Sequence, residues 1–197
     1  MITAVANTKG GVGKTTTCIF MARAAIDSGQ QALVLDADPQ GSASAWTDIV
    51  RGTDGQPDWE TRSVNLHQLR QFAKSPTGDD VDVFIDCPPG NPEIINAAVK
   101  AADVVIVPTQ PTTIDMDRVW TTVENLGDTP CVVLLTGARL GTKLLDEARE
   151  ALRDAGLPVF TTVVPLREDI RAAFGTVPTK LHGYNDVLNE LKDALRG

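Results

Sequence analysis

The chain has 197 residues, a composition ordinary for a soluble globular protein and a formal net charge of −8 at pH 7. This length suits one domain over residues 1–197, and no apolar run approaches the roughly 20 residues of a membrane span. An acidic chain is a poor candidate for nucleic-acid binding, although residues 131–197 balance nine basic against nine acidic side chains. Three cysteines without a C-x-x-C pair favour a reducing, cytoplasmic setting, and we expect no secretion signal.

The first predicted elements are a short apolar strand, a glycine-rich loop and a helix. Residues 4–6 are apolar, three glycines fall within residues 10–13, and residues 18–26 repeat apolar side chains with helical spacing. Such a loop turns backbone N–H groups inward, and glycine lets the backbone approach a phosphate. Lys14 then offers a charge to the terminal phosphates, and Thr15 a hydroxyl ligand for Mg²⁺. The stretch predicts a nucleotide-binding loop.

The loop departs from the common G-x-x-x-x-G-K-[ST] pattern, because Thr8 stands where the first glycine would fall. Lys9 instead precedes the glycines, so two lysines bracket one loop. From spacing alone, Lys9 is either an outward-pointing functional lysine or a solvated surface lysine. Residues 9–16 meet the motif K-G-G-x-G-K-[ST]-[ST], and the chain therefore resembles the ParA/MinD family of deviant Walker A ATPases. The resemblance implies that Lys9 reaches the partner's ATP across a nucleotide-sandwich dimer. It also implies that the nucleotide is held by Gly10, Gly11, Val12, Gly13, Lys14, Thr15 and Thr16.

The next strand, residues 31–35, is followed by the carboxylates of Asp36 and Asp38, which we expect at the sheet edge where open α/β folds bind ligands. Asp38 resembles the aspartate of the family switch D-x-D-P-Q-[GA], which implies that it orients the attacking water beside the metal. Alone, an aspartate before Pro39 would be read as a turn residue. Asp36 is a weaker candidate, near the metal shell or structural.

A short helix over residues 45–50 and a helix over residues 64–72 are predicted next, with Trp46 and Trp59 as packing residues. Residues 81–85 then form an apolar strand that ends at Asp86. An aspartate closing such a strand opposite a phosphate loop has the Walker B arrangement, which holds Mg²⁺ together with Thr15. The following residues resemble the family's D-x-P-P-G switch. This resemblance implies that Gly90 offers a backbone N–H to the γ-phosphate.

Four further elements are predicted as helix 92–101, strand 104–107, helix 114–126 and strand 132–135. The loop over residues 108–112 resembles the family's V-P-x-x-P segment. The last of these strands ends at Thr136, where many relatives place an asparagine that meets adenine, and the N-K-x-D signature of GTP-binding relatives is missing. The loop over residues 165–167 is the alternative base site, and spacing cannot decide between the two. ATP is the predicted nucleotide.

The chain closes with a predicted helix over residues 143–155, a strand over 159–164 and a helix over 183–195. Alternation of strands and helices gives roughly six βα units. It predicts a single-domain α/β P-loop fold with a mainly parallel twisted sheet and helices on both faces. The terminal helix has an apolar stripe, but its polar face holds three acids and two bases, so we expect it to pack on the core.

The resemblance implies a partition ATPase that dimerises with ATP, binds DNA non-specifically on the nucleoid and releases it on slow, Mg²⁺-dependent hydrolysis stimulated by a ParB-like centromere-binding partner. Lys9, Lys14 and Asp38 would carry catalysis, and Thr15, Asp38 and Asp86 would form the metal site. Candidate DNA contacts in the more basic third are Arg139, Lys143, Arg167, Arg171 and Lys180. The first alternative is a MinD-like membrane-cycling ATPase, although no membrane contact is expected here. The second is an ATPase that positions another cargo, such as a protein microcompartment, and the third is a metabolic enzyme on the same scaffold.

Overall fold

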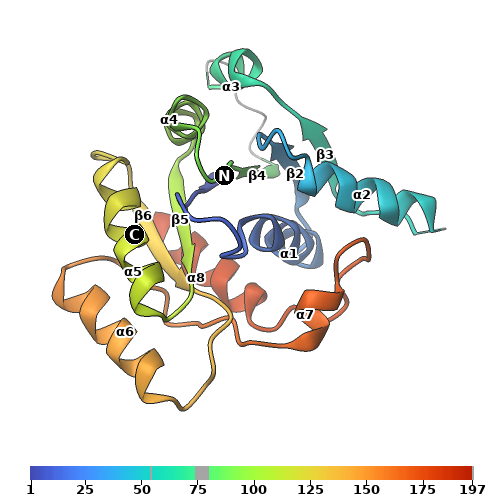
Figure 1. The fold of residues 1–197 in the computed structure, drawn as a ribbon. Coiled ribbons are helices and arrows are strands. Elements are labelled where there is room, and N and C mark those ends of the chain that lie inside the picture. Colours follow the sequence, from blue (N-terminus) through green and yellow to red (C-terminus); the bar gives the residue numbers. More distant parts are fainter. Residues whose placement is uncertain (54, 74–79, 197) are drawn as a thin grey trace.

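The computed structural model describes residues 1–53, 55–73 and 80–196, in which strands and helices alternate as far as the sixth strand and three helices follow (Figure 1). The strands are β1 (Ile2–Val5), β2 (Gln31–Asp36), β3 (Glu60–Ser63), β4 (Val81–Asp86), β5 (Val104–Thr109) and β6 (Cys131–Leu135). The helices are α1 (Lys14–Asp27), α2 (Ser42–Gly52), α3 (Leu66–Phe72), α4 (Pro92–Ala101), α5 (Thr113–Glu124), α6 (Lys143–Asp154), α7 (Glu168–Ala172) and α8 (Tyr184–Arg196). The predicted fold class is confirmed.

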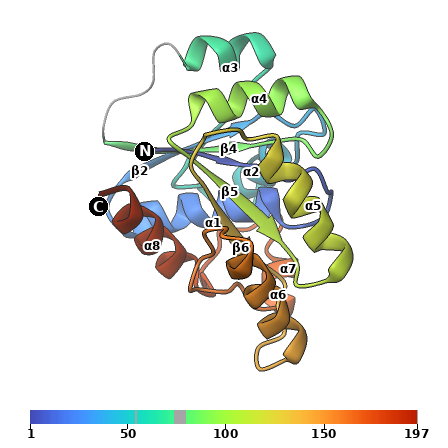
Figure 2. The same cartoon turned by 90° about the vertical axis from the view of Figure 1, so that its left-hand side faces the viewer.

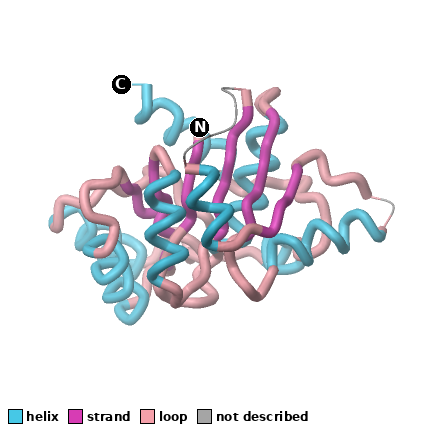
Figure 3. Tube along the Cα trace, turned by 90° about the horizontal axis from the view of Figure 1, so that it is seen from above, coloured by secondary structure: helices cyan, strands magenta, loops and turns pink. Residues whose placement is uncertain are grey.

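The six strands form one parallel sheet in the order β3-β2-β4-β1-β5-β6. Helices cover both of its faces (Figures 1, 2 and 3). Successive strand side chains point to opposite faces, so the sheet contributes to two separate apolar cores. One core lies under α3, α4, α5 and α6, and the other lies under α1, α2 and α8. Because all six strands are parallel, their carboxyl ends lie at one edge of the sheet, together with the loops that follow them.

The order of the strands brings together residues from distant parts of the chain. β4 lies between β1 and β2, and Asp86 is in register with Val5 on one side and with Asp36 on the other. The glycine loop begins directly after β1. Two buried carboxylates thus stand beside the start of this loop, each 1% exposed.

The terminal helix packs on the domain, as predicted. Tyr184, Val187, Leu188 and Leu191 of α8 are buried against α1, and the Tyr184 hydroxyl lies 3.1 Å from the Thr17 hydroxyl. Trp46 and Trp59 are each 2% exposed and are packing residues, again as predicted. No helix among the described residues is long and apolar enough to cross a membrane.

The predicted strand over residues 159–164 is wrong. Two isolated bridges, Val133 with Val159 and Ala138 with Pro165, and a few backbone hydrogen bonds such as Phe160 N–H to the Val133 carbonyl join this extended segment to the sheet edge. The backbone N–H groups of Thr161 and Thr162 bind the carboxylate of Glu190 on α8 instead, at 2.7 and 2.8 Å. Because a side chain takes these donors, no continuous ladder forms.

Two short elements were not predicted. β3 is polar and mostly exposed, so it lacks the apolar alternation that marks a strand. It exists because its backbone pairs in parallel with β2. α7 is a five-residue helix that directly follows the predicted loop over residues 165–167, where no element was predicted.

Candidate functional site

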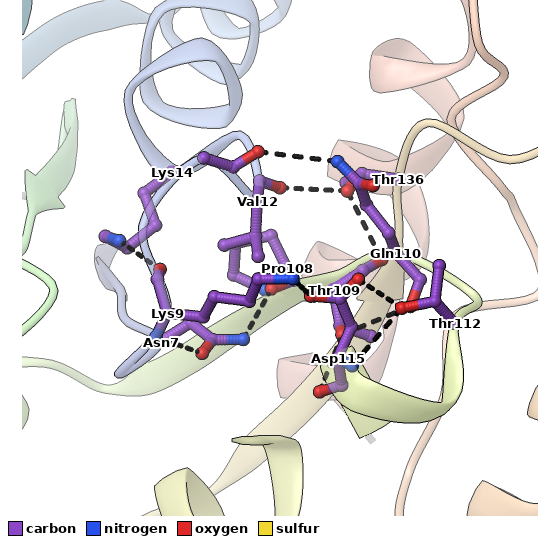
Figure 4. A network of polar contacts seen from close by, with 11 residues as sticks. Asn7, Lys9, Val12, Lys14, Pro108, Thr109, Gln110, Thr112, Asp115 and Thr136 are labelled. Carbon is purple, nitrogen blue, oxygen red and sulfur yellow. Dashed lines mark hydrogen bonds and ion pairs between the residues drawn. The ribbon is translucent and has the colours of Figure 1, made fainter. Parts of the chain in front are cut away.

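The loop between β1 and α1 is held from one side by two distant side chains (Figure 4). The Thr136 hydroxyl donates to the Val12 carbonyl at 2.9 Å, and the Gln110 amide donates to the Gly11 carbonyl at 3.4 Å. In a trans peptide the N–H points away from the C=O, so the next N–H groups of the loop face the opposite side. Gly11 and Gly13 have φ of 77° and 92°, a conformation that glycine adopts without strain. The loop therefore presents its donors to one concave side.

That concave side fits a chain of phosphates. A β-carbon added at Gly10 or Gly11 would meet nothing within 4 Å, so the backbone there borders open space that a side chain would fill. Lys14 begins α1, is 7% exposed and donates through Nζ to the Lys9 carbonyl at 2.9 Å. Burial lowers the pKa of Lys14, an effect opposed by the nearby carboxylate of Asp86. The first turn of α1 adds free N–H donors at the same place.

Thr15 and Asp86 form a pair of oxygen ligands beside the loop. The Thr15 hydroxyl donates to Asp86 Oδ2 at 2.6 Å. Burial raises the pKa of Asp86 to about 7, although the hydrogen bond from Thr15 acts in the opposite direction. A bound divalent cation would remove the cost of this buried charge, and hydroxyl and carboxylate oxygens suit Mg²⁺. The donor set therefore fits the predicted metal.

The two aspartates after β2 have different surroundings. Asp36 is buried, and its Oδ2 accepts the backbone N–H of Ser44 at 2.7 Å, which ties β2 to the first turn of α2. Asp38 is half-buried, and its Oδ1 accepts the backbone N–H of Gln40 at 2.9 Å. Asp38 is thus held in a turn, but its side chain lines the cavity of the glycine loop. Asp36 has a structural contact, whereas Asp38 faces the site.

A cavity of about 350 Å³, the phosphate-side cavity, gathers most of the predicted residues. Gly90 follows Pro89 in the exposed bend after β4 and is not part of the wall. The cavity is lined by Gly10, Gly11, Gly13, Lys14, Thr15, Thr16, Asp38, Ser42, Trp46, Pro89 and Phe174.

Lys9 is neither free in solvent nor directed at the phosphate-side cavity. Its Nζ forms an ion pair with the carboxylate of Asp115 in the first turn of α5, and Asp115 is 2% exposed. The neighbouring backbone N–H of Thr8 donates to the Thr122 hydroxyl, also on α5, at 3.2 Å. Sequence reasoning missed Asp115. Its signal was Thr112, three residues earlier, because a T-x-x-D pattern marks a helix start at this sheet edge.

A second cavity of about 320 Å³, the base-side cavity, lies on the other side of the glycine loop. Thr136 and residues 165–167 all line it, so the two alternative base sites belong to the wall of one space. The loops are joined by backbone hydrogen bonds from Ala138 to Val164 and from Leu166 to Ala138. The Thr136 hydroxyl is bound to the Val12 carbonyl, and Arg167 and Arg171 contribute guanidinium groups to the same wall.

The candidate DNA contacts do not share one environment. Arg167 and Arg171 line the base-side cavity, and Lys180 lines a separate groove. Lys143 pairs with Glu147 at 3.0 Å on the exposed face of α6, and Arg139 is exposed in the loop after β6. Two of the five cations thus lie where a nucleotide would be.

A family model and curated proteins match this chain in sequence. The model of the CobQ/CobB/MinD/ParA nucleotide binding domain matches residues 3–177. The maintenance of carboxysome distribution protein A of Gloeobacter kilaueensis is 38% identical over an alignment of 173 residues, which covers 83% of this chain and 76% of that protein. The chromosome partitioning protein ParA of Caulobacter vibrioides is 32% identical over 148 residues, 55% of each chain.

Solved structures share the fold. Apo McdA from Cyanothece has a TM-score of 0.76 at 19% identity and covers 98% of both chains. Cobyrinic acid a,c-diamide synthase from Mycobacterium smegmatis, solved with an ATP analogue and magnesium, has a TM-score of 0.75 at 22% identity, over 100% of this chain and 96% of that one.

Proposed function

This chain belongs to the CobQ/CobB/MinD/ParA family of nucleotide-binding domains, and on that premise we propose that it is a cargo-positioning ATPase that dimerises around ATP. It is a P-loop ATPase of the ParA/MinD type, and ATP and Mg²⁺ are its ligands. The proposal of an ATP-dependent dimer rests on the pair of lysines on one glycine loop. Lys14 is buried beside the phosphate-side cavity, and Lys9 lies at the loop's start.

The proposed reaction is hydrolysis of the terminal phosphoanhydride. A water oxygen bonds to the γ-phosphorus, and the bond from this phosphorus to the β,γ-bridging oxygen breaks, which leaves ADP and phosphate. Lys14 and the loop N–H groups stabilise the negative charge, and Asp38, fixed by the Gln40 N–H, orients the water. Thr15 and Asp86 would hold Mg²⁺, which supplies further charge neutralisation when bound.

The base-side cavity is the proposed site of adenine. Pro165 and Leu166 offer apolar surface, and Arg167 and Arg171 offer guanidinium groups beside it. A flat base can stack on both kinds of surface. Phosphates on the loop and a base in this cavity place the nucleotide across the first turn of α1.

Dimerisation is proposed because Lys9 stands outside its own phosphate-side cavity. Lys9 is at the loop's start, and 36% of its side chain is exposed. A second protomer facing the nucleotide would let this cation reach the partner's phosphates. Lys9 must then leave Asp115, so binding of ATP and closure of the dimer become linked.

For the cargo, we propose a protein assembly moved over DNA, with a partition complex as the second candidate. The relative named for carboxysome distribution matches 83% of this chain, whereas the ParA relative matches 55%. Hydrolysis would be slow and stimulated by a partner bound to the cargo. Membrane cycling is disfavoured, because the apolar face of α8 is buried on α1.

The test is light scattering of Asp38→Ala with and without ATP and Mg²⁺, repeated with DNA. We expect dimers only with ATP, then salt-sensitive DNA binding without sequence preference. The matched control is Asp38→Ala with Lys9→Ala, which should bind ATP and stay monomeric. A monomer at saturating ATP would contradict the dimer, and DNA binding that ignores nucleotide would contradict the cycle.

A further inference from the structure

The turn between α7 and α8 presents an aromatic side chain that the proposed chemistry does not use. Phe174 is 50% exposed, although it is a large apolar residue in a domain with two well-filled cores. Its ring contacts Trp46 of α2, with ring centroids 5.3 Å apart and planes inclined by 57°. One face of Phe174 is therefore packed and the remainder is free.

The turn is built to hold this ring in place. Trp46 Nε1 donates to the Thr176 carbonyl at 2.8 Å, which anchors the turn on α2. Gly175 has φ of 76°, and a β-carbon there would lie 2.6 Å from Cγ2 of Ile49. Only glycine permits so close an approach of the turn to α2. The position of Phe174 is thus fixed by three contacts with α2.

Phe174 also stands where the two cavities meet. It lines both the phosphate-side and the base-side cavity, and Trp46 does so as well. The other residues common to both walls are Gly11, Gly13 and Thr16, on the loop and the first turn of α1. If a ligand has its phosphates in one cavity and its base in the other, its sugar lies at this junction.

We propose that Phe174 is a nucleoside-binding residue, whose free ring face covers the ribose and the adjoining edge of the base. This inference rests on the proposed nucleotide function and assigns the wall that closes over the sugar. Burial of the free ring face by the nucleoside stabilises the complex, since aromatic rings gain most from apolar and π contacts. The phosphates touch the backbone and cations, so their binding does not depend on Phe174.

The test compares ADP with inorganic pyrophosphate, both with Mg²⁺, by isothermal titration calorimetry. Neither ligand calls for dimerisation or hydrolysis, so the result is independent of those parts of the proposed function. In Phe174→Ala we expect ADP to bind about tenfold more weakly, within the range for loss of one base-stacking contact. Pyrophosphate affinity should change by less than about twofold, and Phe174→Tyr should bind ADP nearly as wild type.

The control variant is Leu195→Ala, which removes another exposed apolar side chain, 44% exposed at the end of α8. It should leave both affinities unchanged, and thermal melting verifies that every variant is folded. Unchanged ADP affinity in Phe174→Ala, or an equal loss for ADP and pyrophosphate, would overturn the assignment. Failure of wild type to bind either ligand would instead overturn the nucleotide function itself. Dimerisation without ATP would contradict the proposed cycle but not the role of Phe174, because the affinities for ADP and pyrophosphate do not depend on the dimer.

Discussion

Lys9 and Asp115 are 106 residues apart in the sequence, yet their side chains form an ion pair at the start of the glycine loop (Figure 4). Asp115 is buried, and its other carboxylate oxygen accepts the Thr112 hydroxyl. The lysine proposed to act on a partner's nucleotide is therefore bound by its own subunit in this structure. The pair links the loop to α5, and two predictions depend on it.

The first prediction concerns stability without ligands. Lys9→Ala leaves a buried carboxylate without its cation, so we expect the free energy of unfolding to fall by about 2 kcal/mol or more. Adding Asp115→Asn to Lys9→Ala should recover about 1 kcal/mol, because the uncompensated charge is gone. Urea denaturation of both single variants and the double variant measures this coupling. Lys143→Ala, in the exposed pair with Glu147, should cost less than about 0.5 kcal/mol. Additive effects at Lys9 and Asp115 would show that the pair is energetically unimportant.

The second prediction concerns dimerisation. If Lys9 must leave Asp115 to reach the partner's nucleotide, a neutral Asn at position 115 lowers the cost of the exchange. In the Asp38→Ala background, Asp115→Asn should form ATP-dependent dimers at about three- to tenfold lower protein concentration, as for a gain of about 1 kcal/mol. Sedimentation velocity measures this shift, and a further Lys9→Ala change should abolish it. Weaker dimers with Asp115→Asn would mean that Asp115 supports Lys9 in the dimer as well.

The third prediction concerns the Thr136 hydroxyl, which holds the Val12 carbonyl. Thr136→Val keeps the shape but leaves that buried carbonyl without its donor, at a cost of about 1 to 2 kcal/mol. We expect a lower melting temperature and a three- to tenfold weaker affinity for ADP, since about 1 kcal/mol corresponds to this range. Thr136→Ser keeps the hydroxyl and should stay close to wild type in both measurements. Equal behaviour of the Val and Ser variants would show that this hydrogen bond does not shape the loop.

The fourth prediction is a dependence on pH that Asp86 imposes on the metal-free protein. Burial raises the pKa of Asp86 to about 7 in the folded state, while an unfolded chain loses this proton near pH 4. Between these values the folded state binds more protons, so this group makes stability fall as pH rises from about 4 to about 7. Asp86→Asn should remove that fall and be more stable than wild type at pH 8, by on the order of 2 kcal/mol.

Urea denaturation at pH 5 and pH 8, with a chelator and without nucleotide, measures this difference. Asp193→Asn is the matched control, because its carboxylate is largely exposed near the end of α8. It should follow wild type at both pH values. An Asp86→Asn variant that keeps the wild-type difference between pH 5 and pH 8 would show that Asp86 stays ionised in the folded protein.

Some errors of the sequence analysis have a shared cause. Residues 159–164 carry the apolar residues of a strand, and the N–H groups of Phe160 and Val164 bond to β6, but Glu190 takes the N–H groups between them and interrupts the ladder. β3 has the opposite character, since its polar residues carry no strand pattern and its pairing with β2 alone defines it. In both cases hydrogen bonding with a distant segment decided the outcome.

The sequence by itself determined the parts whose physics is local. A glycine loop before a helix, a buried strand followed by Asp38, a buried strand that ends in Asp86, and the alternation of strands and helices could all be predicted, because backbone conformation and burial leave short-range patterns. The tertiary structure alone decided which other side chains meet. The pairing of Thr15 with Asp86 was predicted, but the placement of α5 at the same sheet edge gives Lys9 its partner Asp115, and the turn on α2 brings Phe174 to the junction of the two cavities. These contacts depend on strand order and loop paths, which residues far apart in the chain fix only when they pack together.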